Sequence, residues 1–230
     1  MSLFVIGDLH FSYAIDKPMD IFGDNWINHS EKIICDWNEK VKEEDTVVLA
    51  GDISWAMKKE DAKVDLDIIN DLPGKKVILC GNHDYWWSSV SKLTSLYPKM
   101  FFLRDNSTGY KDIGICGGRG WICPNDETFT KEDRKVFNRE LMRIENSIQS
   151  ALKNGYKKLY AFLHFPPTYQ GEKDSELTHL LNKYNEIEKV FYGHIHDEEG
   201  HKACLKGFVN GKEYYLISSD YMNFKLFKIE

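Results

Sequence analysis

The sequence predicts an α/β fold that begins with a parallel β-sheet. In the first third of the chain, apolar runs of strand length alternate with segments whose apolar residues recur at helical spacing. Such alternation implies parallel strands joined by right-handed crossovers. Each of the first three strands also ends in glycine followed by a polar residue, namely Asp8, Asp52 or Asn82. Ligands bind beyond the carboxyl ends of strands in open α/β sheets, so these residues are candidates for a functional site.

The three strands are expected at residues 2–6, 46–50 and 76–80, each a short apolar run. The third strand leads directly into Gly81-Asn82-His83-Asp84, and a helix is expected to start at Tyr85. An amide, an imidazole and a carboxylate therefore stand together where a buried strand ends.

Two helices are expected to connect these strands. Asn28 and Glu31 have the spacing of a capping box at the start of the first helix. The second helix is expected at residues 59–72, where Pro73-Gly74 ends it. Their apolar faces consist of Ile33, Ile34, Trp37 and Val41 in the first helix and Ala62, Leu66 and Ile69 in the second.

The rest of the chain continues with strands and helices in a less regular order. Strands at 101–103 and 113–116 are expected to lie around a turn at Asp105-Asn106. The longest helix is expected at 130–154, and its amphipathic stripe is Phe137, Leu141, Ile144, Ile148 and Leu152. The remaining elements are strands at 158–163 and 189–192, a helix at 175–184 and strand-like runs at 203–209, 214–218 and 224–229, the first two joined by the hairpin signal Asn210-Gly211. No linker or repeat interrupts the chain, so one domain, 1–230, is expected.

Composition narrows the class of protein. A net charge of −6 and a pI near 5.8 argue against a broad surface for nucleic acid or anionic lipid. No apolar run approaches the ~20 residues that a membrane helix needs, and the N-terminus lacks the basic region of a signal peptide. Five cysteines without a CxxC pair indicate reduced thiols. A cytoplasmic protein without nucleic-acid or membrane partners is expected.

Five strand ends carry side chains that bind metals. Five of the eight histidines lie in these short stretches. In chain order, the five strand ends carry Asp8 with His10, Asp52 alone, Asn82 with His83, His164 alone, and His194 with His196. Imidazole, carboxylate and carboxamide oxygen suit first-row divalent metals, and the lack of a thiolate argues against a zinc–sulfur site.

Simpler interpretations exist for some of these residues. Asp8, Asp52 and Asn82 could each cap a helix. His194 and His196 could form a small zinc knot with His201 and Cys204. The other three histidines, His29, His179 and His201, are expected at the surface.

The glycine-rich segment 117–121 follows the strand at 113–116, and two interpretations of it remain open. Its glycines make a tight exit from the strand, or they cradle a phosphate while Arg119 contacts the substrate.

The five motifs, in order, resemble the signature of the calcineurin-like metallophosphoesterases and span residues 7–196. The resemblance implies a four-layer αββα sandwich of two mixed sheets flanked by helices, with metals at the strand ends and the C-terminal strands in the second sheet. It assigns one metal to Asp8, His10, Asp52 and His196, and the other to Asp52, Asn82, His164 and His194. It also implies that His83 protonates or stabilises the leaving oxygen, and Asp84 would orient its ring.

The predicted function is dinuclear metal-dependent hydrolysis of a small phosphate ester, either a monoester or a diester. Two cations about 3.5–4 Å apart need an anion between them, which Asp52 would supply, and a hydroxide bridging them would attack in line. Manganese, iron and zinc all fit these ligands. Two alternatives remain open, a nuclease of the same superfamily and a non-catalytic binding module. The acidic charge counts against the first and the complete ligand set against the second.

Overall fold

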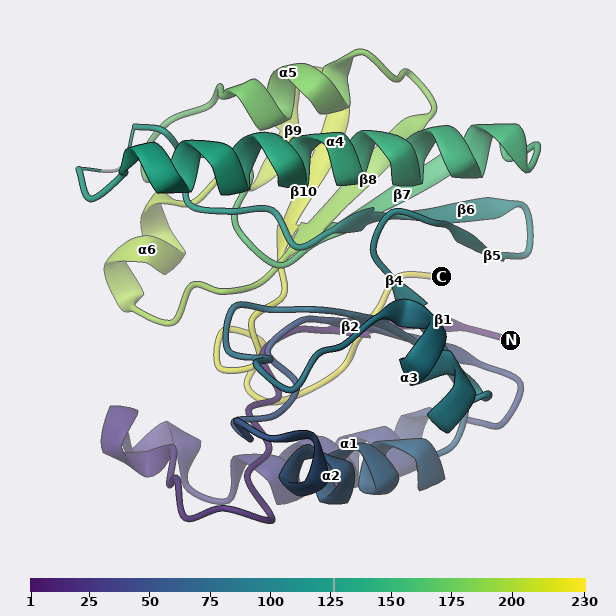
Figure 1. The fold of residues 1–230 in the computed structure, drawn as a ribbon, viewed down its shortest axis with the longest axis vertical. Helices are drawn as coiled ribbons and strands as arrows, with labels where there is room; N and C mark the ends of the chain where they lie inside the picture. The colour runs from purple at the N-terminus through teal and green to yellow at the C-terminus, as the bar shows by residue number, and fades with distance from the viewer. Residues whose placement is uncertain (126) are drawn as a thin grey trace. The chain divides into compact units, whose positions relative to one another are not determined.

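The computed structural model describes residues 1–125 and 127–230, which form two compact units. The first unit contains residues 1–102 and 217–230, and the second contains residues 103–216. Each unit is built on one β-sheet with helices packed against it (Figure 1). Both sheets mix parallel and antiparallel pairs, so the predicted α/β class with two mixed sheets is confirmed.

The sheet of the first unit has the strand order β11-β1-β2-β3-β4. Its strands are β1 (Leu3–Ile6), β2 (Thr46–Ala50), β3 (Lys75–Leu79), β4 (Met100–Leu103) and β11 (Phe227–Lys228). The first three pair in parallel, which confirms the prediction from alternation. The expectation that all C-terminal strands join the second sheet is wrong, because β11 pairs antiparallel with β1.

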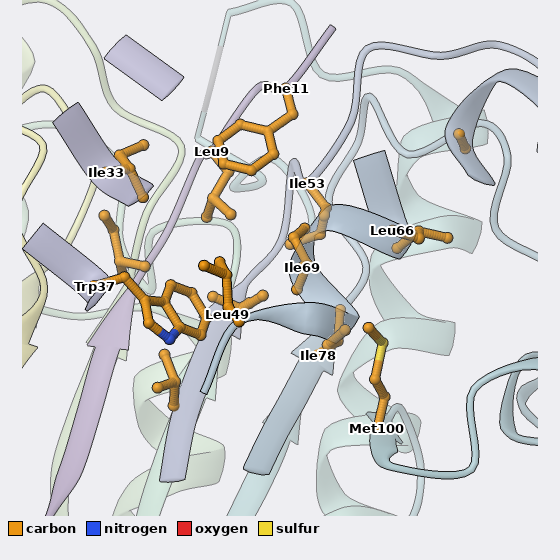
Figure 2. Packing of buried hydrophobic residues seen from close by; sticks show 14 of the residues in the cluster. Leu9, Phe11, Ile33, Trp37, Leu49, Ile53, Leu66, Ile69, Ile78 and Met100 are labelled. Atoms are coloured by element: carbon orange, nitrogen blue, oxygen red, sulfur yellow. The ribbon is translucent and has the colours of Figure 1, made fainter. Parts of the chain in front are cut away.

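One face of this sheet is covered by α1 (His29–Lys40) and α2 (Lys59–Asp71) (Figure 1). Figure 2 shows Ile33 and Trp37 of α1 and Ile69 of α2 packed around Leu49. The predicted apolar faces of both helices are therefore confirmed. Two short 3-10 helices, η1 (Asp20–Phe22) and η2 (Asp24–Trp26), precede α1.

Two local predictions in the first unit are wrong. Asn28 precedes α1 with a left-handed backbone (φ 54°) and makes no side-chain cap, so the capping box is absent. The helix after β3 is α3 (Val90–Leu96), which starts five residues later than expected. Residues 85–89 are not helical. The Trp87 N–H closes a turn by donating to the Asp84 carbonyl, and Ser89 caps α3.

The sheet of the second unit has the order β5-β6-β7-β8-β10-β9. Its strands are β5 (Thr108–Tyr110), β6 (Ile113–Gly118), β7 (Lys158–Leu163), β8 (Ile187–Tyr192), β9 (Gly207–Val209) and β10 (Lys212–Leu216). The predicted hairpin is confirmed, since β9 and β10 pair antiparallel around Asn210 and Gly211, both with positive φ. The strands at 101–103 and 113–116 belong to different sheets, and β6 pairs instead with β5, which the sequence analysis missed.

Three helices belong to the second unit: α4 (Lys131–Lys153), α5 (Glu176–Asn182) and α6 (Glu198–Ala203). Ile144 and Ile148 of α4 are fully buried in one cluster with Leu159 and Ala161 of β7, which confirms the predicted stripe. Thr130 and Asp133 form a capping box at the start of α4. α6 was not predicted, because its six residues are too few to show an apolar period.

All five cysteines are free thiols, as the sequence predicts. Among the described residues, no helix combines the length and the apolar character that crossing a bilayer requires.

Candidate metal centre

Four of the seven predicted ligands have an uncommon backbone conformation. Nine described non-glycine residues have a positive φ, and four of them are predicted ligands. These are Asp8 (57°), His10 (49°), Asp52 (51°) and His194 (74°). Such a backbone is unfavourable for residues with a side chain, and it persists at functional sites because surrounding contacts enforce it.

In the first unit, the ends of β1 and β2 are joined through their backbones. The Asp8 N–H donates to the Gly51 carbonyl at 3.0 Å, and the His10 N–H donates to the Asp52 carbonyl at 2.9 Å. The Ser219 hydroxyl donates to the Asp8 carbonyl at 2.7 Å. Asp8, His10 and Asp52 are each at most 2% exposed, and His10 Nε2 lies 3.8 Å from Asp52 Oδ2. These hydrogen bonds thus bring three predicted ligands to one edge of the sheet.

The end of β3 meets the same carboxylate. The His83 N–H donates to Asp52 Oδ1 at 2.8 Å, which ties the Gly81-Asn82-His83 turn to the end of β2. A Cβ atom on Gly81 would lie 2.0 Å from Asp52 Oδ1, so this approach requires glycine. The first unit therefore gathers its predicted ligand-bearing turns around Asp52.

Asp84 is buried and holds two of these turns together. One of its oxygens accepts the N–H groups of Ile53 and Ser54 and the indole N–H of Trp86, and the other accepts the Gly81 N–H. Burial and the nearby Asp52 charge raise the pKa of Asp84 to about 7, although the backbone donors oppose this. These contacts give the carboxylate a role in fixing the backbone, and its orientation of the His83 ring stays a prediction.

In the second unit, the ends of β7 and β8 bring two histidines together. The rings of His164 and His194 lie 5.1 Å apart at 77°, and a nitrogen of one lies within 4.8 Å of a nitrogen of the other. The Gly193 N–H donates to the His164 carbonyl at 3.1 Å, and Phe165 lies 4.2 Å from the His194 ring. His164 is fully buried, whereas His196 is half-buried.

Arg119 follows β6 beside this pair. Its carbonyl accepts the N–H groups of His164 and Phe165, at 3.1 and 2.8 Å. Its guanidinium lies 3.4 Å from the buried Glu140 carboxylate and 4.5 Å from the centre of the Trp121 ring. Gly117 has φ 137°, and a Cβ atom there would meet the Phe162 carbonyl oxygen at 1.8 Å, so this glycine serves the tight strand exit.

The described residues give the simpler interpretations no support. None of Asp8, Asp52 and Asn82 occupies the N-cap position of a described helix, where other residues stand instead. His201 Nε2 lies 3.0 Å from the Ile195 carbonyl, and Cys204 Sγ points to the His201 carbonyl, so these two residues make backbone contacts.

The expected surface position of His29 is wrong. Its side chain is 7% exposed, and Nε2 lies 3.2 Å from the His10 carbonyl. His29 and Trp26 also line a cavity of about 270 Å³ in the first unit, formed by residues between Ser12 and Glu31.

Two residues at the predicted ligands escaped the sequence analysis. Ser219 supports Asp8, and its signal was available, since Ser218-Ser219 follow a strand just as the ligands do. Trp55 lies against both His10 and His83, and nothing in the local sequence indicates this contact.

The described donors fit transition-metal ligation. In the first unit, a carboxylate oxygen of Asp8 and a ring nitrogen of His10 lie within 4.8 Å of each other, as do ring nitrogens of His164 and His194 in the second. Carboxylates and imidazoles at this spacing are the ligands that manganese, iron and zinc accept.

Comparison with solved structures shows which proteins share the fold. A protein described as TT1561 of Thermus thermophilus aligns with a TM-score of 0.59 and 14% identity, covering 98% of this chain and 96% of its own. Phosphopantetheinyl hydrolase from Mycobacterium tuberculosis aligns with a TM-score of 0.57 and 11% identity, covering 99% and 95%. GAP50, described as the anchor in the inner membrane complex of Plasmodium, aligns with a TM-score of 0.51 and 13% identity, covering 96% and 72%.

Sequence comparison identifies the family. A search of curated proteins found no match. The pattern of the calcineurin-like phosphoesterases, in contrast, matches residues 1–198, which include every predicted metal ligand. The chain therefore belongs to the calcineurin-like phosphoesterase family and is a metallophosphoesterase, a hydrolase of phosphoric esters.

Proposed function

We propose that this protein is a dinuclear phosphohydrolase that acts on a small phosphate ester in the cytoplasm. The chain would act as one domain. Its metal ligands would be Asp8, His10, Asp52, Asn82, His164, His194 and His196. The observation that carries this proposal is the positive φ of four of these residues, because backbone strain is retained where function needs it.

The residues divide the chemistry among them. When bound, two metal ions supply an activated water for in-line attack and positive charge against the phosphoryl oxygens. Two contacts support Asp52 as the shared ligand: one of its oxygens lies near His10, and the other accepts the His83 N–H. His83 would give a proton to the leaving oxygen, and Asp84 would fix the turn that carries it.

Metal stoichiometry tests this proposal. Wild-type protein should bind about two Mn, Fe or Zn ions per chain, and hydrolyse aryl phosphate monoesters or diesters. Asp52→Asn should lower occupancy at both positions, because an amide supplies one weaker oxygen in place of a shared anion. Metal analysis by mass spectrometry after dialysis measures the loss.

Asp67→Asn is the matched control, because this acid lies on α2 and pairs with the exposed Lys63. It should keep both metals. Full metal content in folded Asp52→Asn would show that Asp52 is not the shared ligand. Paired rates on monoester and diester substrates would also settle which ester the enzyme prefers.

Arg119 is proposed to contact the substrate phosphate. Its position after β6, with its backbone bound to His164, supports this role. Arg119→Gln should raise KM about tenfold and change kcat less, as expected for a lost charge-assisted contact that substrate and transition state share. Arg134→Gln removes an exposed arginine paired with Glu176 and should leave KM unchanged. Equal KM values for the two variants would show that Arg119 does not contact the substrate.

The non-catalytic alternative has one supporting observation, since the fold of GAP50, described as an anchor, is shared by this chain. A metal-loaded protein that hydrolyses no ester in a broad panel would favour it. The nuclease alternative predicts salt-dependent binding to DNA or RNA, which the net charge of −6 opposes.

A further inference from the structure

Trp55 stands between two functional histidines of the first unit. Its ring stacks on His10 at 4.7 Å and 20°, and it lies 4.3 Å from the His83 ring at 49°. We propose that Trp55 is a positioning residue that holds the His83 imidazole in the orientation for proton donation. This inference rests on the proposed function, because it assumes that His83 serves the leaving oxygen.

The indole itself is held in place. The Trp55 backbone N–H donates to the Phe11 carbonyl at 2.9 Å, and the indole Nε1–H points to Met19 Sδ at 2.8 Å. Lys17 Nζ lies 3.3 Å from the ring centre, in a cation–π contact. Trp55 is 7% exposed, so its ring has little room to move. The segment before α1 thereby fixes the indole against the histidines.

The backbone contact of His83 does not by itself set the direction of its ring. The hydrogen bond from its N–H to Asp52 fixes the main chain but neither side-chain torsion. The Trp55 ring lies 4.3 Å from this ring, closer than those of His10 and Tyr85, which lie 5.9 and 6.4 Å away. A proton donor must direct its N–H at the leaving oxygen, so a ring displaced from this orientation would donate less efficiently.

Leaving-group dependence separates positioning from a general structural role. An alkyl ester needs its leaving oxygen protonated, whereas a p-nitrophenyl ester departs without help. At saturating metal, Trp55→Leu should slow the alkyl ester about 10- to 100-fold and the p-nitrophenyl ester less than about threefold. Trp55→Phe retains an aromatic ring and should recover most of the alkyl rate.

Trp87→Leu is the control for loss of an indole, since Trp87 packs on Phe102 in the same unit. It should slow both esters equally or not at all. If Trp55→Leu also slows both esters equally while metal content is full, the positioning role is overturned.

A measurement without turnover keeps this inference separate from the proposed function. In metal-free protein, the indole ring current should displace the Cε1–H resonances of His10 and His83 in proton NMR spectra. Trp55→Leu should move both resonances and leave that of the exposed His179 unchanged. If the leucine variant does not fold, Trp55→Phe provides the same comparison with a smaller shift. Unchanged resonances in a folded variant would show that Trp55 does not hold these rings, whether or not the wild type hydrolyses esters.

Discussion

Gly81→Ala should destroy the junction between the β2 and β3 turns, with loss of bound metal and of ester hydrolysis. The added Cβ atom would lie 2.0 Å from Asp52 Oδ1 and 2.2 Å from the Asp52 nitrogen. The backbone nitrogen cannot move aside, because it belongs to the turn that bonds His10. We expect a free energy of unfolding lower by about 3 kcal/mol, in the range of overpacked cores, and a Tm lower by about 6–12 °C.

Thermal unfolding by circular dichroism measures the first effect, and metal analysis of the folded protein measures the second. Gly171→Ala is the control, because Gly171 has a positive φ of 76° but open space around it. That variant should lose about 1 kcal/mol from backbone strain and keep its metals. A Gly81→Ala protein as stable and as metal-loaded as wild type would contradict the described contact with Asp52.

His83→Ala should retain both metals and lose turnover by about 10²- to 10⁴-fold on an alkyl phosphate. The metals remain because alanine keeps the backbone N–H that donates to Asp52 Oδ1. Turnover falls because the variant lacks the imidazole proton, and the neighbouring Trp55 ring has no acidic proton to give in its place. Steady-state rates and metal content of the same preparation measure both effects.

Imidazole added to His83→Ala should restore part of the lost rate, because a free ring can enter the space and donate a proton. His179→Ala removes an exposed histidine paired with Asp174 and should behave as wild type. If folded His83→Ala hydrolyses an alkyl phosphate as fast as wild type, His83 has no catalytic role.

Local patterns predicted much of the fold because the relevant interactions are short in sequence. Ile144 and Ile148 lie on one face of α4 through helical geometry alone, and both are fully buried as expected. The strand ends were visible for a similar reason, since an apolar run followed by glycine and a polar residue is a local signal. Prediction failed where a residue type suits two local structures. Asn28, for example, has a left-handed backbone and does not cap α1.

Other features depend on residues that are far apart in the chain. His29 is buried because its ring contacts the carbonyl of His10, although its own helix gives no such indication. Similarly, Asp84 bonds the N–H groups of Ile53 and Ser54, about thirty residues earlier, and no spacing rule links these segments.

The sequence by itself determined the family, the α/β class and the identity of the candidate ligands, because each depends on residue types at fixed short spacings. The tertiary structure decided how the candidate ligands of the first unit are held: the left-handed backbones of Asp8, His10 and Asp52, and the contact of Trp55 with the His83 ring. These depend on packing between strand ends that only the folded chain brings together, and no local pattern encodes packing between distant segments.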